Sequence, residues 1–361
     1  MSPVYNFASG PARLPDAVLE RARDTLLLRG ADGACALERP FSSPAFRATL
    51  ERARQRLAAL LGLPAGYRVL FLAGGAMQQF SMVPLNLLGR ARCAAYADSG
   101  YWAGRAIREA RRYAEVAVVA RYQGATPLAA PPLANWPLPD DCAYCHITPN
   151  ETGEGIAYPA LPDTGAVPLV ADATSCFLAG PLDVSRFGLI YAGAQKNIGP
   201  AGLTVVIVRE DLLEREARYA PAPYCYRQQL AENNTVNTPV GWAIELAALV
   251  FDWIAESGGL AAMALANRRK AERLYHAIDT SGGFYQAPVA HGHRSPSNVR
   301  FQLADERLTE PFLQQAEAAG LTHLRGHCHV GGLRASLYNA MPQAGVDALV
   351  AFMADFSRRQ G

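Results

Sequence analysis

Apolar residues recur along the first two thirds of the chain in two alternating patterns. In the segment 44–62 they repeat every three or four positions, which places Phe46, Leu50 and Leu57 on one face and predicts a helix. Short apolar runs predict strands at 68–73, 93–97, 115–119, 143–147, 168–173, 188–192 and 203–208. Several of them lack alternation, as expected for strands that helices cover on both faces. Strands that alternate with helices predict an α/β domain with a largely parallel sheet.

The pattern changes after a long apolar helix predicted over 241–259. A helix-rich segment follows it, and then come two strands and a closing helix, predicted at 297–303, 332–338 and 343–359. This mixed order predicts a smaller α+β domain. We place the boundary near 256–262, which gives a large domain at 1–257 and a C-terminal domain at 258–361.

Composition narrows the possible functions. The chain has 361 residues, 50% of them hydrophobic, which is enough for one large or two ordinary domains with buried cores. A net charge of +2 does not favour binding to nucleic acid or to an anionic membrane. No apolar run reaches the roughly 18 residues of a membrane helix, and the first residues do not resemble a secretion signal. Seven cysteines, an odd number, favour the reducing cytoplasm over a disulfide scaffold.

Only two of the 34 basic residues are lysines, Lys196 and Lys270. A lysine kept in such an arginine-rich chain suggests a task that arginine cannot perform. Lys270 lies in the polar helical stretch ANRRKAERL and is predicted to be a solvated surface charge. Lys196 lies between two apolar strands in a loop of small residues, where it could form a Schiff base with an aldehyde or ketone. The alternative is a loop lysine that makes a surface hydrogen bond.

Two further features favour the Schiff base. Asp172 ends the apolar strand in VADATS, where an acid can keep a pyridine nitrogen protonated so that the ring accepts electrons. The turn Gly74-Gly75-Ala76-Met77 lies between a strand and a helix, so its backbone N–H groups can hold a phosphate. A glycine turn, then an aspartate, then a lysine is the order found in pyridoxal-phosphate (PLP) enzymes.

Longer segments resemble one known family. The segment YAGAQKNIGPAGLTVVIVREDLL (191–213) closely resembles the lysine segment of the phosphoserine aminotransferases, which are class V aminotransferases. The same resemblance extends to NFASGPARLP, GYW, PNETGEGIA, PLDVSRFGLIYAGAQKN, NTP and GGLRASLYNAMP, and so covers residues 5–360. It implies PLP fold type I, with an α/β large domain, a smaller α+β domain, and a homodimer whose active site lies at the subunit interface.

The resemblance also implies roles for individual residues. Lys196 would bond to PLP and move the proton at Cα, Asp172 would pair with the pyridine nitrogen, and Trp102 would stack on the ring. Arg334 would bind the substrate α-carboxylate, with Ser9 and His327 also on the substrate side. The remaining cofactor contacts would come from Ala76, Met77, Thr152 and Gln195, and from Asn237 and Thr238 of a second subunit.

The segments that should bind the substrate phosphate depart from the family. Phe41 and Ser42 stand where the family has a His-Arg pair, and Cys328 stands where it has arginine beside the retained His327. Losing one charged hydrogen bond costs about 1.5–3 kcal/mol, so we predict an aminotransferase for glutamate and a small, unphosphorylated 2-oxo or 2-amino acid. The alternative is a genuine phosphoserine aminotransferase, in which Arg39, Arg227, His327 or His329 replaces the missing arginines.

Other functions stay possible at this stage. A PLP-dependent lyase or decarboxylase could use the same fold. Cys142-x-x-Cys145 with His146 suggests a metal or redox site, but no second such motif supplies further ligands, so no metal is expected. A binding protein without activity is disfavoured because Lys196, Asp172 and Trp102 are all retained. The expected partners are therefore small-molecule substrates and a second copy of the chain.

Overall fold

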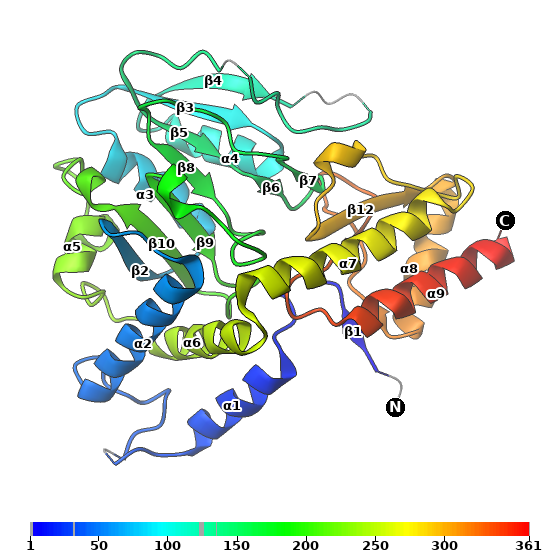
Figure 1. The fold of residues 1–361 in the computed structure, drawn as a ribbon, viewed down its shortest axis with the longest axis horizontal. Coiled ribbons are helices and arrows are strands. Elements are labelled where there is room, and N and C mark those ends of the chain that lie inside the picture. Colours follow the sequence, from blue (N-terminus) through cyan, green and yellow to red (C-terminus); the bar gives the residue numbers. More distant parts are fainter. Residues whose placement is uncertain (1–2, 32, 123–125, 135, 361) are drawn as a thin grey trace.

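A seven-stranded sheet is the centre of the larger lobe in the computed structural model, which describes residues 3–31, 33–122, 126–134 and 136–360 (Figure 1). From one edge to the other its strands are β2 (Tyr67–Ala73), β10 (Leu203–Arg209), β9 (Leu189–Gly193), β8 (Leu169–Asp172), β5 (Cys142–Ile147), β3 (Cys93–Asp98) and β4 (Glu115–Arg121). Of these, β10 pairs antiparallel with β2 and β9, and the remaining pairs are parallel. The predicted largely parallel sheet is confirmed.

Helices cover both faces of this sheet. On β2, Val69 and Phe71 point to one face and Leu70 and Leu72 to the other, because side chains alternate along a strand. The first face packs against α1 (Asp16–Leu27), α2 (Pro44–Leu61) and α6 (Gly241–Glu256). The second packs against α3 (Ala76–Leu87) and α4 (Tyr101–Ala110). This double covering explains why the strands read as uninterrupted apolar runs.

Local sequence signals set the ends of α2. The Ser43 hydroxyl accepts a hydrogen bond from the Phe46 N–H at 3.1 Å, and Pro44 occupies the first helical position, where its missing N–H costs nothing. Gly62 ends the helix at φ 55°, a left-handed conformation that glycine adopts without steric cost. The helix predicted at 44–62 is thereby confirmed to within one residue.

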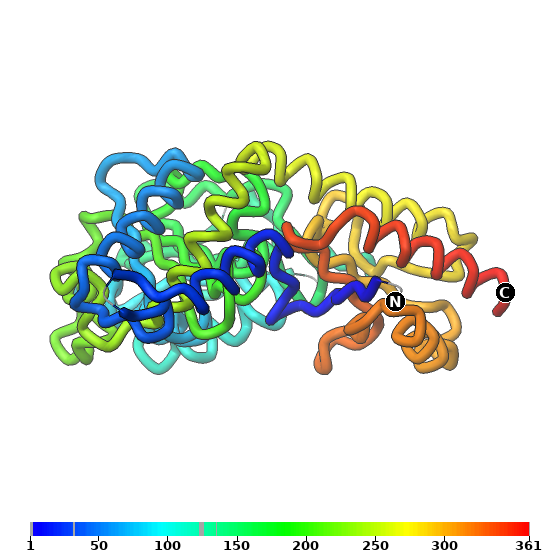
Figure 2. The backbone as a smooth tube through the Cα atoms, turned by 90° about the horizontal axis from the view of Figure 1, so that it is seen from below, coloured from blue at the N-terminus to red at the C-terminus, as the bar shows by residue number. Residues whose placement is uncertain are grey.

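The smaller lobe has its own core. An antiparallel sheet of β11 (Tyr285–Gln286), β12 (Asn298–Leu303) and β14 (Leu333–Ser336) packs with α7 (Gly259–Asp279), α8 (Thr309–Ala318) and α9 (Gln343–Gln360). The N-terminal strand β1 (Tyr5–Asn6) pairs with β13 (Leu321–Thr322) of this lobe, and Phe7 is buried in its core. Figure 2 shows the chain then running back under the larger lobe towards α1. The division at 257/258 falls between α6 and α7 and stays a prediction.

Helices α6 and α7 connect the two lobes. Within the described residues, no single helix is long and apolar enough to cross a membrane. Only α6 and α7 taken together are, and they are bent by 83° where they meet. The first half of α7 packs Leu260 and Met263 against the larger core, and its second half packs Leu274 and Ile278 into the smaller one.

The prediction for Lys270 is wrong. Its polar neighbours Arg268 and Arg269 are exposed, but Lys270 itself is only 2% exposed and points from α7 into the protein. Its Nζ donates hydrogen bonds to the backbone carbonyls of Leu337, Tyr338 and Met341. A polar stretch did not reveal this position because one buried residue per turn is enough to hold a helix against a core.

Candidate active site

A cavity of about 250 Å³ opens where the parallel strands end, beside Lys196. Lys196 lies in the turn between β9 and β10, and Asp172 is the last residue of β8. Ligands of open α/β sheets bind at this carboxyl edge of the strands. The residues that line the cavity are Gly75, Ala76, Met77, Trp102, Thr148, Asn150, Thr152, Asp172, Thr174, Ser175, Gln195 and Lys196. Seven of the nine predicted cofactor residues are thus gathered in one place.

Lys196 combines burial with a pKa suited to a nucleophile. Its Nζ hydrogen-bonds the Thr152 hydroxyl and lies 5.9 Å from the centre of the Trp102 ring. Burial lowers the pKa of Lys196 to about 8; the Asp172 carboxylate opposes this shift, and the Arg334 charge adds to it. A larger fraction of this amine is therefore neutral, and able to attack a carbonyl carbon, than of a solvated lysine at the same pH.

Asp172 is the one carboxylate among the described residues that line the cavity. Its Oδ1 accepts a hydrogen bond from the Thr174 N–H at 3.0 Å. Burial raises the pKa of Asp172, while the Thr174 hydrogen bonds and the Lys196 charge oppose that rise. A buried carboxylate without a full cationic partner is costly, which makes Asp172 a strong site for a cationic group of a ligand.

Trp102 is held in place by two carboxylates that the sequence analysis missed. Glu151 accepts hydrogen bonds from the N–H groups of Trp102 and Ala103, at 3.1 and 2.9 Å, and Glu154 accepts one from Tyr101 at 2.9 Å. They cap the N-terminus of α4 from the PNETGEGIA loop, which also carries Thr152. Burial raises the pKa of both carboxyls, and the Glu154 charge raises that of Glu151 further.

The glycine that precedes α4 is a signal in the sequence for this cap. Gly100 precedes α4 at φ 154°, and a Cβ there would lie 2.8 Å from the Glu154 carboxyl carbon. Glycine is thus needed for the close approach of the carboxylate. Gly100 before α4, together with Glu151 and Glu154 on either side of Thr152, is therefore the signal in the sequence for a loop that packs against the start of this helix.

The residues around the cavity fit PLP. Gly75 precedes α3 without a side-chain cap, so the first N–H groups of this 12-residue helix, those of Ala76 and Met77 among them, can bind a phosphate. The buried Trp102 Nε1 has no hydrogen-bond partner among the described residues. With these N–H groups for the phosphate, Lys196 for the aldehyde and Asp172 for the pyridinium, three polar parts of the cofactor have a matching group in the cavity.

The predicted substrate-side residues do not line the cavity, but Arg334 and His327 lie next to Thr152 and Trp102, which do. Arg334 is buried and donates to the Ser9 hydroxyl at 2.7 Å and to the Thr152 carbonyl at 3.4 Å. The rings of His327 and His329 lie 4.5 and 5.0 Å from that of Tyr101, and His327 lies 6.3 Å from Trp102. Burial lowers the pKa of His327, and the Arg334 charge lowers it further. Cys328, between the two histidines, is exposed.

Other predicted residues do not line the cavity. Phe41 and Ser42 are exposed on the loop before α2. Asn237 and Thr238 line a different cavity, next to β2. Arg39 lies 3.7 Å from Glu245, so its charge already has a partner.

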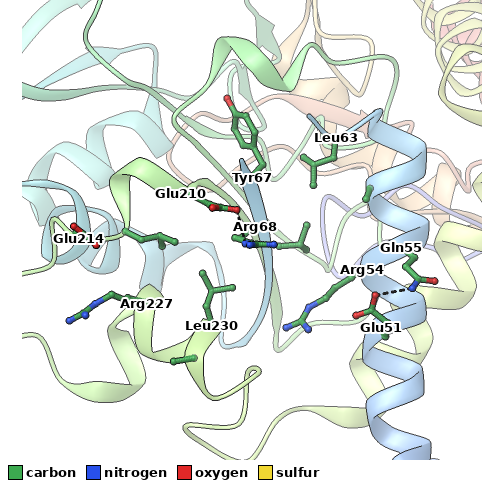
Figure 3. Close-up of a pocket in the computed structure, with 14 residues that line it drawn as sticks. Glu51, Arg54, Gln55, Leu63, Tyr67, Arg68, Glu210, Glu214, Arg227 and Leu230 are labelled. Atoms are coloured by element: carbon green, nitrogen blue, oxygen red, sulfur yellow. Dashed lines mark hydrogen bonds and ion pairs between the residues drawn. The ribbon is translucent and has the colours of Figure 1, made fainter. Parts of the chain in front are cut away.

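Arg227 also lies elsewhere. It lines a third pocket between α2, β2 and α5 (Tyr226–Ala231), which Figure 3 shows with Arg54 and Arg68. This pocket shares no lining residue with the cavity at Lys196. Arg227 pairs there with Glu216.

The CxxC segment is part of the core. Cys145 and His146 are buried in β5, and His146 Nε2 hydrogen-bonds the Tyr191 hydroxyl at 2.8 Å. Across the described ranges, no three histidine, cysteine or acidic side chains are placed to hold a metal ion. His146 therefore serves packing and a buried hydrogen bond.

Comparison with known proteins gives the family. The model of the class V aminotransferases matches residues 4–349. The chain is a class V aminotransferase. It is 49% identical to the phosphoserine aminotransferase of Pseudomonas aeruginosa and 48% identical to that of Azotobacter vinelandii, over 99% of both chains in each case.

Solved structures agree with this aminotransferase assignment. The phosphoserine aminotransferase from Bacillus circulans subsp. alkalophilus superposes with a TM-score of 0.97 at 44% identity, and covers 100% of both chains. A PLP-bound phosphoserine aminotransferase from Trichomonas vaginalis gives 0.92 at 37% identity, over 97% of this chain and 99% of that one. Fold type I, PLP as cofactor and aminotransferase activity, all predicted from the sequence, are thereby confirmed.

Proposed function

We propose that this aminotransferase moves an amino group between glutamate and 3-phosphohydroxypyruvate. The observation that carries the proposal is identity of 48–49% along 99% of the chain to proteins named phosphoserine aminotransferase. The site geometry adds support, because the His327 imidazole and the Arg334 guanidinium lie next to Trp102 and Thr152, which line the Lys196 cavity. The unphosphorylated substrate predicted from the sequence is the second candidate.

The residues in and next to the cavity have different roles in the proposed reaction. Bound PLP supplies an electron sink for the bond that breaks at the substrate Cα. Lys196 would hold PLP through its amine, and the same amine would serve as the base that takes up and returns the proton at the substrate Cα. Asp172 keeps the pyridine nitrogen protonated, and Arg334 binds the α-carboxylate with its planar pair of N–H donors. Trp102, fixed by the carboxylates of Glu151 and Glu154, supports the ring.

Two histidines are proposed to recognise the substrate phosphate. His327 and His329 both flank Tyr101, and their ring centres lie 5.6 Å apart, so one anion can accept from both. Because burial lowers the pKa of His327, the free enzyme at pH 7 presents it as a neutral donor. A bound phosphate would favour its protonated form, and binding should therefore take up protons. This pair would compensate in part for Phe41, Ser42 and Cys328.

The decisive experiment compares two amino acids that differ by one phosphate. We expect the PLP-loaded enzyme to convert L-phosphoserine with a kcat/KM at least about 100-fold above that for L-serine, since two charged hydrogen bonds contribute about 3 kcal/mol or more. The His327→Ala/His329→Ala variant should lose most of this ratio, while its reaction with glutamate changes little. Loss of the visible cofactor absorbance in the first half-reaction measures each rate. A ratio near one would contradict the proposal.

The second candidate is an unphosphorylated substrate, favoured by Phe41, Ser42 and Cys328. If it is right, the enzyme should react with glutamate but not with phosphoserine. The variant Phe41→His/Ser42→Arg/Cys328→Arg should then gain phosphoserine activity by about two orders of magnitude or more. A folded triple variant without any gain would speak against this candidate.

A homodimer with shared sites is also proposed. Asn237 and Thr238 line a cavity that is separate from the one at Lys196, so within one chain they have no place in the cofactor site. We expect a dimer by light scattering, and we expect the variants Lys196→Ala and Thr238→Ala, each impaired alone, to regain activity when their subunits are mixed. Half of the mixed dimer's sites would then be intact. A monomer, or no regain after subunit exchange, would refute shared sites.

A further inference from the structure

The second lysine of the chain occupies an unusual buried position. Lys270 Nζ donates to the carbonyl oxygens of Leu337, Tyr338 and Met341, at 3.0, 2.8 and 3.0 Å. Across the described residues no carboxylate lies within ion-pair distance of it. The three acceptors belong to the turn that connects β14 with α9. Lys270 thus ties this turn, residues 337–341, to the middle of α7.

Arginine could not make the same contacts. An ammonium group directs three N–H donors tetrahedrally from one point, which matches three carbonyls that converge on one atom, whereas a guanidinium spreads its donors in a plane. The chain uses arginine at 32 of its 34 basic positions, yet it keeps lysine here. Lysine at 270 is therefore explained by the geometry of its acceptors.

The turn leads to Arg334 through Tyr338. Lys270 holds the Tyr338 carbonyl, and the Tyr338 hydroxyl donates to the Ser9 carbonyl at 3.0 Å. Arg334 in turn donates to the Ser9 hydroxyl at 2.7 Å. Ser9 therefore orients the Arg334 guanidinium, which is proposed to bind the substrate. Tyr338, as part of the turn, holds Ser9 in place.

The same turn also leads to Lys196. The Asn339 N–H donates to Asn197 Oδ1 at 3.0 Å, and Asn197 directly follows Lys196 in the chain. Asn267, one turn before Lys270 on α7, donates to Asn339 Oδ1 at 2.7 Å. Two residues of α7 therefore hold the turn at four positions, Lys270 at Leu337, Tyr338 and Met341 and Asn267 at Asn339.

We propose that Lys270 is a positioning residue of the aminotransferase: it fixes the turn 337–341, and through that turn it fixes Arg334 and Asn197. The inference rests on the proposed binding of the substrate α-carboxylate by Arg334. Burial lowers the pKa of Lys270 to about 7, and three carbonyl acceptors favour its ammonium form. Its contribution is geometric and involves no contact with substrate.

The test uses the PLP-loaded enzyme with Lys270→Met, which keeps the length of the side chain and removes its donors. The matched control is Arg269→Met, an exposed neighbour on the same helix. We expect Lys270→Met to raise the apparent Kd of glutamate in the half-reaction by about tenfold or more, whereas the control stays at the wild-type value. Amide hydrogen exchange within 337–341 should become faster without substrate, while exchange in β3 and β8 is unchanged.

Further variants separate the possible outcomes. Tyr338→Phe should raise the glutamate Kd as well, and combining it with Lys270→Met should raise it by less than the product of the two effects. Faster exchange with an unchanged Kd would reduce Lys270 to a structural role and overturn the proposal. If Lys270→Met does not fold, the glutamate Kd of Lys270→Arg is measured instead. A wild-type Kd in that variant would also overturn the proposal that Lys270 is a positioning residue. Arg334→Lys identifies a different failure: unchanged glutamate binding there would refute the proposed role of Arg334 itself.

Discussion

Replacing Lys196 by arginine should abolish amino transfer while the cofactor stays bound. Arginine keeps a positive charge in the cavity but has no amine that can attack a carbonyl or exchange the Cα proton, because its guanidinium stays protonated. Proton transfer by a positioned side chain contributes about 10²–10⁴-fold on its own, so we expect at least that loss in kcat. The turn at Gly75 and the carboxylate of Asp172 remain to hold PLP. Single-turnover absorbance with glutamate measures the loss.

A chemical label makes this prediction independent of activity. Borohydride reduction fixes PLP covalently to whichever lysine it is bonded to, and the chain offers only Lys196 and Lys270. Lys270 is engaged with three carbonyls, so we expect the label on the Lys196 peptide alone, and no label in Lys196→Arg. Measurable amino transfer by the arginine variant, or a label on Lys270, would refute the assignment.

The sequence was sufficient to predict most of the strands and helices, and seven of the nine proposed cofactor residues line one cavity. Uninterrupted apolar runs predicted most of the strands because these strands are covered on both faces, whereas the edge strand β4 is only half-buried. Residues at the ends of those strands, such as Asp172, converge because parallel strands present their carboxyl ends at one edge. The glycine turn and the lysine loop are likewise local signals. Each of these signals can be identified within its own segment, without knowing which distant residues contact it.

Contacts between distant segments were not readable in the same way. The residues next to Lys270 in the sequence are polar and suggest a solvated side chain. Its burial depends on the turn 337–341, which is distant in the sequence. Glu151 and Glu154 lie in a motif, but their partners are N–H groups at the start of α4, about 50 residues earlier. Backbone acceptors and donors carry no sequence signature. A buried polar residue whose partner is the backbone is therefore the kind of residue that pattern analysis loses.

Changing Asp172 to asparagine should have the second largest effect. The substitution keeps the shape and removes the one carboxylate among the described residues of the cavity. Leaving a buried cationic partner without its anion costs about 3–5 kcal/mol, so we expect kcat/KM for glutamate to fall by roughly 10²–10⁴-fold. The half-reaction with glutamate, followed by the cofactor absorbance, measures it. A loss below about tenfold would mean that Asp172 does not carry this charge.

The same substitution makes a second, cofactor-free prediction about Lys196. The Asp172 carboxylate raises the pKa of Lys196, against the burial that lowers it to about 8. Without that carboxylate the pKa of Lys196 should fall further, so the neutral amine predominates at lower pH. In the enzyme stripped of PLP, the rate at which a small aldehyde modifies Lys196 should therefore reach its plateau at lower pH in Asp172→Asn than in the wild type. Asp183→Asn, an exchange of an exposed aspartate in the larger lobe, should leave that profile unchanged. If the profile moves towards higher pH or not at all, Asp172 does not set the reactivity of Lys196, and the charge arrangement derived for the cavity is wrong.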